Sequence, residues 1–156
     1  MSSLIKYFDF LTPRELYQIL KIRQEVFMLE QQILCPDCDG VDYNAWHIMG
    51  LADDGRTIVG CARLFKGAEN GVACIGRLAV AKEYRGRQIG RSIMDAALNI
   101  ATDNLKAKTV EIHAQSHVIP FYEKLGFVVS SDEFLEEGVP HRKMTIDLKQ
   151  RMQYWI

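Results

Sequence analysis

The sequence lacks long apolar runs, and no segment approaches the roughly 20 residues that a membrane-spanning helix needs. Residues 1–10 also lack the basic region followed by an apolar stretch that is typical of an export signal. These two absences predict a cytoplasmic protein that does not use a membrane.

The sequence has no excess of charge of one sign. Its 19 Lys and Arg residues are balanced by 20 Asp and Glu residues, for a formal net charge of -1. This balance argues against broad binding to nucleic acids or anionic membranes, because both depend on a dense positive field. The exception is a local basic patch formed by Arg85, Arg87 and Arg91.

Cysteine is scarce, and the four cysteines come without an export signal, which predicts reduced thiols rather than a disulfide framework. Cys35 and Cys38 have C-x-x-C spacing, so zinc binding or thiol-disulfide chemistry is a distant alternative. A zinc site needs two more ligands, and a redox pair usually opens a helix, whereas this pair follows a predicted helix. We expect no metal site, because the other possible zinc ligands are isolated from one another in the sequence: Cys61, Cys74 and His47.

Three aspartates, Asp37, Asp39 and Asp42, form a short acidic segment after the first cysteine. They lack the twelve-residue spacing and the terminal Glu of a calcium-binding loop. We interpret the segment as a solvated acidic loop, with attraction of a cationic amine as the functional alternative.

Apolar residues make up 48% of the 156 residues, enough for a substantial core in one domain spanning residues 1–156. Thr12, Pro13 and Glu15 indicate a capped helix start, and an apolar stripe continues to about residue 27. A second helix follows residue 88, with an apolar side at positions 89, 93, 96, 97, 100 and 101, and a short third helix spans 119–125. The expected strands are 4–10, 45–51, 56–65, 72–80, 109–114, 127–131 and 143–148, of which 45–51, 56–65 and 72–80 form an antiparallel meander.

Residues 75–94 have the order strand, basic loop, helix. Gly86 and Gly90 allow a ligand to approach the backbone closely, and the first N–H groups of the helix have no internal hydrogen-bond partners. Nearby arginines add positive charge. Together these features suit the binding of a diphosphate. The loop is neither a Walker loop, which ends in Gly-Lys-Ser/Thr, nor a G-x-G-x-x-G dinucleotide loop.

This stretch resembles motif A of the GNAT superfamily of N-acetyltransferases, Q/R-x-x-G-x-G/A, with Arg85 at its start and Gly90 at its end. Gln88 occupies the position of the middle glycine in the family motif. This departure puts in doubt any special backbone dihedral angle at that position. Residues 114–127, ending in F-Y-E-K-L-G-F, resemble motif B. Three further segments resemble the ElaA-like branch of the superfamily: 23–31, 37–42 and 136–141.

The resemblance implies an α/β (α+β) fold in which helices flank a mixed, mostly antiparallel central sheet. It also implies direct transfer of an acetyl group from acetyl-CoA to a primary amine of a small molecule or a peptide. The implied acetyl-CoA contacts are the backbone of Leu78, Ala79 and Val80, the loop and first helical turn, and two residues of motif B: Arg85, Gly86, Arg87, Gln88, Ile89, Gly90, Arg91, Ser92, His117 and Tyr122.

Tyr122 matches the tyrosine that often protonates the departing thiolate in this superfamily, and a phenol near the sulfur suits that task. The amine must also lose a proton, either to water or to a side chain. Glu30, His47 and His141 are candidate bases by residue type and position, and no motif selects among them.

Two questions stay open at this level. The same pocket would serve a non-catalytic acyl-CoA sensor or interaction module. The apolar tail is a candidate for packing on its own domain or on a second copy in a homodimer: Met152, Tyr154, Trp155 and Ile156.

Overall fold

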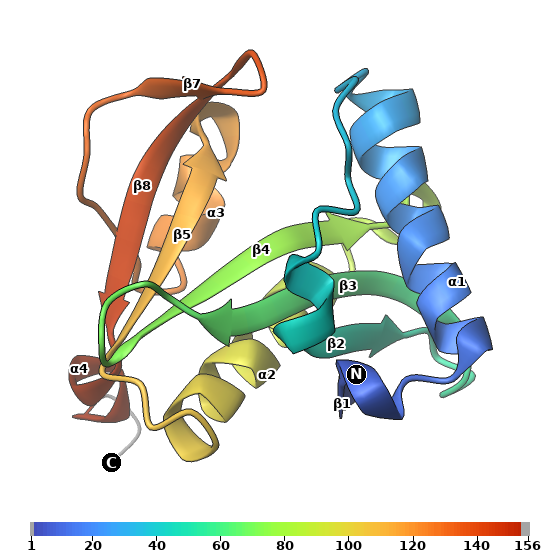
Figure 1. Ribbon diagram of the computed structural model, residues 1–156, viewed down its shortest axis with the longest axis horizontal. Coiled ribbons are helices and arrows are strands. Elements are labelled where there is room, and N and C mark those ends of the chain that lie inside the picture. Colours follow the sequence, from blue (N-terminus) through green and yellow to red (C-terminus); the bar gives the residue numbers. More distant parts are fainter. Residues whose placement is uncertain (1, 154–156) are drawn as a thin grey trace.

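The computed structural model describes residues 2–153. Within them the chain forms one mixed sheet with helices on both faces (Figure 1). The strands are β1 (Ser3–Tyr7), β2 (Trp46–Leu51), β3 (Ile58–Lys66), β4 (Val72–Val80), β5 (Thr109–Gln115), β6 (Val128–Val129), β7 (Phe134–Glu136) and β8 (Val139–Asp147). The helical segments are η1 (Phe8–Phe10), α1 (Pro13–Arg23), η2 (Gln24–Glu30), η3 (Val41–Asn44), η4 (Lys82–Tyr84), α2 (Ile89–Asp103), η5 (Ser116–Val118), α3 (Ile119–Glu123) and α4 (Leu148–Gln153).

The strand order is β1-β2-β3-β4-β5-β8-β6, and β7 also pairs with β8. β1 to β4 form the expected antiparallel meander, β4 and β5 are parallel, and β8 runs antiparallel to β5. This arrangement confirms the mixed, mostly antiparallel sheet flanked by helices that the resemblance implied.

Helix α1 begins where the sequence predicts. The hydroxyl of Thr12 accepts a hydrogen bond from the N–H of Glu15, whose carboxylate accepts one from the N–H of Thr12. The helix continues into the π-helical segment η2, in which the N–H of Gln31 donates to the carbonyl of Val26. The buried side of α1 and η2 packs on one face of the meander, and the cluster contains Ile19, Ile22, Val26, Met49, Cys61 and Ala79.

Helix α2 covers the opposite face. A Cβ atom at Gly50 or Gly60 would lie 2.9 Å from Ile93 Cδ1, so these glycines let the helix approach β2 and β3 closely. The predicted apolar side is correct but incomplete, because Met94 and Leu98 are also fully buried. The helix faces a core shared with β5 and β8 and therefore buries a wider stripe than the meander alone would require.

Four strands differ from the expectation by two residues or more at one end. β3 begins at Ile58 rather than at residue 56. β1 ends at Tyr7, because residues 8–10 turn in a 3-10 helix, and β6 contains only two residues. β8 begins at Val139, and it forms an unpredicted hairpin with β7. The hairpin turns through Glu137 and Gly138, whose φ angles are 51° and 75°. Glu-Gly is a weaker turn signal than Asn-Gly, so the hairpin was not evident from sequence.

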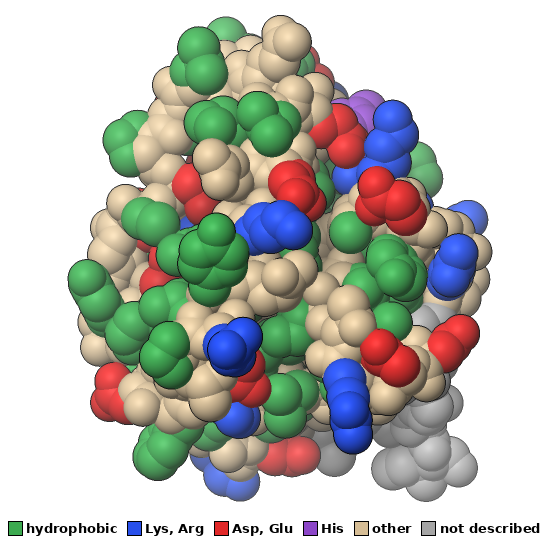
Figure 2. Space-filling model, turned by 90° about the vertical axis from the view of Figure 1, so that its right-hand side faces the viewer, with side chains coloured by type: hydrophobic (Ala, Val, Ile, Leu, Met, Phe, Trp, Pro, Cys, Tyr) green, Lys and Arg blue, Asp and Glu red, His purple; other side chains and the backbone are tan. Residues whose placement is uncertain are grey.

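Acidic and basic side chains are interspersed on the face that carries α1 (Figure 2). Among residues 2–153, no helix combines the length and the apolar character needed to cross a bilayer. The tail proposed for packing lies outside the described part: Tyr154, Trp155, Ile156 and the side chain of Met152.

Candidate active site

Strands β4 and β5 separate after a short parallel contact. Their register covers only Val72–Cys74 opposite Thr109–Glu111, and beyond it the two strands diverge (Figure 1). Val80 is opposite Gly60 in the β3–β4 register, and the next N–H along the chain donates to the carbonyl of Val59. The N–H and C=O of Val80 therefore point away from β3, toward the edge where β5 has left.

A bulge bends β4 along this open edge. Ala79 is opposite Cys61, whereas Gly76 is opposite Arg63, so β4 has one more residue than β3 across this interval. Arg77 lies in the bulge with a φ of 55°. Bulges of this kind turn a strand and redirect its backbone groups.

The loop after β4 presents unpaired amides. Within residues 2–153, the N–H groups of residues 86–91 donate no hydrogen bond, and the first internal bond of α2 comes from Ser92 to the carbonyl of Gln88. Gln88 has φ 64° and ψ 15°, and Gly86 has φ 76°. The doubt about the backbone at Gln88 was therefore wrong, because this glutamine adopts the left-handed conformation that usually favours glycine. Such a concave set of amides at a helix N-terminus suits an anion.

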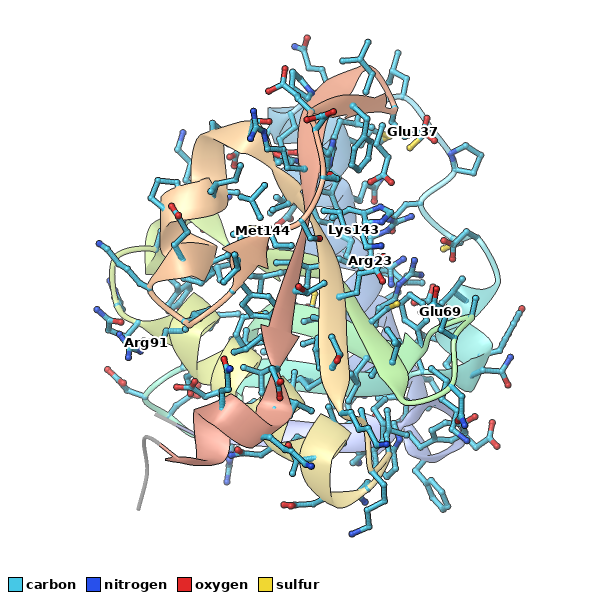
Figure 3. The ribbon with its side chains drawn as sticks, turned by 90° about the vertical axis from the view of Figure 1, so that its left-hand side faces the viewer. Arg23, Glu69, Arg91, Glu137, Lys143 and Met144 are labelled. Carbon is cyan, nitrogen blue, oxygen red and sulfur yellow. The ribbon has the colours of Figure 1, made fainter. Side chains whose placement is uncertain are left out.

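The three arginines of the loop have different surroundings. Arg85 donates to both carboxylate oxygens of Glu30, at 2.7 and 2.9 Å, and its Nε donates to the carbonyl of Val80 at 3.0 Å. The Arg87 guanidinium lies 5.2 Å from the ring centroid of Tyr84. Arg91 projects outward from α2 (Figure 3). Arg87 and Arg91 are thus the arginines whose charge is not already neutralised by a neighbouring carboxylate in the described structure.

Helix α3 meets this loop at Gly90. A Cβ atom there would lie 3.6 Å from Phe121 Cζ and 3.7 Å from Val80 Cγ2. Tyr122 follows Phe121, and its ring contacts the rings of Phe121 and Phe127 edge-on. Burial raises the pKa of Tyr122 to about 12, so the phenol stays protonated at neutral pH. His117 is exposed in the preceding η5.

The three candidate bases lie apart and in different environments. His47 is 1% exposed, its Nε2 lies 3.0 Å from the carbonyl of Asp42, and burial lowers its pKa. The hydrogen bonds from Arg85 hold the pKa of Glu30 below its ordinary value. His141 is 7% exposed, with Nδ1 2.7 Å from the carbonyl of Val139. The structure does not bring these residues together.

Comparison with known proteins places this geometry in a family. Residues 44–148 match the model of the acetyltransferase (GNAT) domain. The chain belongs to the GNAT acetyltransferase family. A UPF0039 protein of Schizosaccharomyces pombe is 35% identical over 149 residues, 95% of this chain and 98% of that protein. Protein ElaA of Escherichia coli is 32% identical over 143 residues, 90% of this chain and 92% of its own length.

Solved structures agree with this assignment. The crystal structure of Escherichia coli ElaA matches this GNAT chain with a TM-score of 0.85 and 30% identity, over 94% of this chain and 99% of that one. An acyl-CoA N-acyltransferase from Pseudomonas aeruginosa matches with a TM-score of 0.84 and 30% identity, over 93% and 98%. The resemblance to the GNAT family and its ElaA-like branch is confirmed. Membership supports transfer of an acyl group from an acyl-CoA donor to an amine-bearing acceptor.

The acidic segment of this GNAT chain is not a solvated loop. Asp42 accepts hydrogen bonds from Arg23 at 2.8 Å and from Arg63 at 3.2 Å, and both arginines are buried. Asp39 accepts two hydrogen bonds of 2.8 Å from Arg63. Asp37 accepts from Arg23 Nε at 2.7 Å. Three arginines, the third being Arg77 in the β4 bulge, thus balance the three aspartates.

Electrostatics keep this cluster charged. Burial alone would lower the pKa of Arg23, but the hydrogen bonds and charge of Asp42 hold it above its ordinary value. Burial would likewise raise the pKa of Asp42, but Arg23 and Arg63 hold it below. The hydrogen bonds from Arg63 lower the pKa of Asp39. The segment therefore anchors the chain between η2 and β2 to the sheet, and its carboxylates are engaged rather than available to a cationic substrate.

The pKa is raised for three of the thiols: Cys35, Cys61 and Cys74. All four cysteines are free, and burial raises the pKa of Cys61 to about 12. Burial, followed by the charge of Glu137, also raises the pKa of Cys35. A raised pKa disfavours the thiolate that redox chemistry and metal binding require. Within residues 2–153 no cluster of three or more His, Cys, Asp or Glu side chains could hold a metal ion.

Sequence reasoning missed a polar group on β5 and its neighbours. His113 Nδ1 lies 2.8 Å from Glu136 Oε1, and His141 Nε2 lies 3.6 Å from Glu136 Oε2. His113 Nε2 lies 3.8 Å from Glu111, which also lies 3.4 Å from Lys143 Nζ. Nothing in the sequence pairs residues 113 and 136, because the contact depends on the unpredicted β7–β8 hairpin.

Proposed function

We propose that this GNAT chain transfers an acetyl group from acetyl-CoA to a primary amine of a small molecule or a peptide. The proposal rests on one observation: three structural elements lie next to one another at Gly90. They are the unpaired amides before α2, the open end of β4 at Val80, and α3 with Tyr122. Each part offers what one portion of the donor needs.

The pyrophosphate of the donor would accept hydrogen bonds from the amides of residues 86–91, with Arg87 and Arg91 supplying charge. The amide-bearing pantetheine arm would lie along the open edge of β4 beside Leu78, Ala79 and Val80, and would pair with the backbone groups that, like those of Val80, point away from β3. Ser92, in the first turn, and the exposed His117 lie on the elements that border this path. Arg85 has a positioning role, because it donates hydrogen bonds both to Glu30 and to the backbone carbonyl at the end of β4.

The chemistry is a direct attack without a covalent enzyme intermediate. The neutral amine nitrogen forms a bond to the thioester carbon, the carbon–sulfur bond breaks, and the nitrogen loses one proton to water as the amide forms. A backbone N–H of β4, the strand that ends at Val80, would donate to the carbonyl oxygen as charge develops on it. Tyr122 gives its proton to the departing thiolate, a task suited to a phenol that is protonated at neutral pH.

Calorimetric titration of acetyl-CoA tests donor binding. A Cβ atom at Gly90 makes only ordinary contacts, so Gly90→Ala should fold and bind. Gly90→Glu places a larger, negative side chain beside the phosphate amides and should abolish binding. Thermal melts of both variants separate a loss of binding from a loss of folding. No binding by the wild type, or equal binding by Gly90→Glu, would contradict the proposed donor site.

Transfer is then measured by mass spectrometry of the acetylated products. The acceptors are lysine, putrescine, phenethylamine and a short peptide with a free N-terminus. Binding of acetyl-CoA without transfer to any of them would instead favour a non-catalytic acyl-CoA sensor with the same fold.

A further inference from the structure

We propose that His113, oriented by Glu136, is the general base that removes a proton from the acceptor amine. The inference rests on the proposed acetyl transfer and names the base that the sequence left undecided. The two faces of β5 and β8 carry different kinds of side chain, apolar on one face and polar on the other.

One face of these strands belongs to the core with α2 and α3. Val110, Ile112 and Ala114 on β5 alternate with polar residues, and Met144 and Ile146 on β8 lie on the same apolar side. Figure 3 shows Lys143 and Met144 pointing to opposite sides of β8. The phosphate amides and Tyr122 also lie on the α2 and α3 side. The donor therefore occupies this side of the opening between β4 and β5.

The other face is polar and turned toward the end of η2. It carries Glu111, His113 and Gln115 from β5, and the amide of Gln115 donates to the side chain of Gln31 at 2.9 Å. The last parallel pair between β4 and β5 is Cys74 opposite Glu111, so His113 lies two residues past the point where the strands separate. An acceptor that approaches from this face meets the opening beside His113.

The surroundings of His113 fix its orientation. A carboxylate only accepts hydrogen bonds, so the 2.8 Å contact with Glu136 places the proton of a neutral His113 on Nδ1. Nε2 then carries the lone pair that can take a proton. The ring of Phe134 meets the imidazole edge-on, with centroids 5.3 Å apart. This is the arrangement of a base held by a third group.

The charges around His113 suit the same role. Glu136 faces Nδ1, and Glu111 lies 3.8 Å from Nε2, so both carboxylates stabilise the imidazolium that forms. Lys143 lies 3.4 Å from Glu111 and offsets part of that charge, while His141 shares Glu136 at 3.6 Å. The exposed fraction of the side chain is 46% for His113 and 9% for His141. A substrate can therefore reach His113, whereas His141 lies behind Glu136.

The proton balance of the step is simple. The lone pair of Nε2 takes a proton from the ammonium group of the acceptor, which leaves a neutral amine and a protonated His113. The amine then attacks the thioester carbon, the carbon–sulfur bond breaks, and Tyr122 protonates the thiolate. The second proton that the nitrogen loses as the amide forms passes through water and restores the phenol of Tyr122. His113 returns its own proton to water through its exposed edge.

The first experiment determines by NMR which ring nitrogen of neutral His113 carries the proton, from the chemical shifts of Nδ1 and Nε2. The wild type should carry it on Nδ1, because the carboxylate of Glu136 accepts its hydrogen bond. Glu136→Ala removes that acceptor and should shift the proton toward Nε2, whereas Glu69→Ala, on the exposed turn between β3 and β4, should leave it on Nδ1 (Figure 3). The same tautomer in wild type and Glu136→Ala would overturn the assignment without any measurement of transfer.

The second experiment compares the pH profile of kcat/KM in wild type and His113→Gln with the best amine of the panel. Near neutral pH the variant should lose about 100-fold, the usual contribution of general base catalysis. The gap should narrow near pH 10, where alkyl amines lose their proton in solution. An active wild type with an undiminished His113→Gln would overturn this assignment alone. A wild type inactive on every amine would overturn the proposed function and the assignment together.

Discussion

Arg85 donates two hydrogen bonds to Glu30 and a third to the carbonyl of Val80, so that one side chain joins the end of η2 to the end of β4. Both partners are more than one third exposed, with side-chain exposed fractions of 39% for Arg85 and 37% for Glu30. The pair therefore fixes the geometry beside the proposed donor site more than it stabilises the fold, because exposed ion pairs contribute little free energy.

Glu30→Gln tests whether Glu30 has a catalytic role. Loss of a catalytic base would lower kcat about 100-fold or more, but we expect kcat to stay within about threefold of wild type, because Arg85 already engages this carboxylate. The free energy of unfolding should fall by less than about 1 kcal/mol. Steady-state kinetics and urea unfolding measure the two quantities. A kcat reduced 100-fold with unchanged stability would restore Glu30 as the base.

Asp42→Asn should be among the most destabilising polar substitutions in the chain. It leaves Arg23 and Arg63 buried without their shared carboxylate, and breaking a buried ion pair typically costs about 3–5 kcal/mol. Asp53→Asn, in the exposed turn between β2 and β3, is the matched control and should change stability by less than about 0.5 kcal/mol. Urea unfolding measures both. Equal midpoints for the two variants would mean that the cluster contributes nothing to the fold.

The same cluster predicts a loss of stability in acid. The pKa values of Asp39 and Asp42 are lower in the folded protein than the ordinary value of about 3.9. Their contribution is therefore fully present above that value and is lost as the pH falls toward the folded pKa values, because the unfolded chain then binds more protons. His47, whose pKa is also lowered, adds a slope of the same sign that begins near pH 6.5.

Asp39→Asn isolates one part of this dependence. The free energy of unfolding should fall less steeply below about pH 4 in the variant than in the wild type, since one carboxylate with a lowered pKa is gone. The slope between pH 4 and 6.5 should be the same in both proteins. Urea titrations across this pH range measure the slopes, and parallel curves down to pH 3 would contradict the ion pairing of Asp39.

The sequence was informative where the signal was local. The capping box at Thr12 and Glu15, the meander and the start of α2 all depend on residues close together in the chain, and all are confirmed. Motif A located the loop, although the resemblance did not reveal that Gln88 itself adopts a positive φ.

The remaining features depend on residues far apart in the chain. Arg23 begins the segment 23–31 that resembles the ElaA-like branch, and nothing near it in the sequence predicts its burial. It is 1% exposed because Asp42, 19 positions later, lies on the segment that packs beside it. His113 and Glu136 are 23 positions apart and meet only through the hairpin of β7 and β8. No periodicity encodes such pairs, since each depends on the sheet order.

Gln88→Gly tests the left-handed residue before α2. A non-glycine residue in this conformation carries a steric cost of about 1–2 kcal/mol, and glycine offsets part of that gain through its entropy in the unfolded chain. We therefore expect Gln88→Gly to keep or slightly raise stability and to bind acetyl-CoA as the wild type does. Gln88→Val should weaken binding at least several-fold, because a β-branched residue resists positive φ. Calorimetry and thermal melts measure both, and equal affinity in the valine variant would show that the amides do not depend on this backbone.

Tyr122→Phe tests the proposed acid. Within the described residues the hydroxyl of Tyr122 makes no hydrogen bond, so the variant should retain its stability and its affinity for acetyl-CoA, whereas kcat should fall about 100-fold. The pKa of about 12 adds a second expectation. The acid form persists to high pH, so the wild-type rate should show no alkaline decline due to Tyr122 below about pH 10. Phe121→Leu, which alters the same helix without removing a proton donor, is the matched control and should lower kcat far less. If Tyr122→Phe and Phe121→Leu have the same kcat, the effect is one of packing, and another group or water must protonate the thiolate.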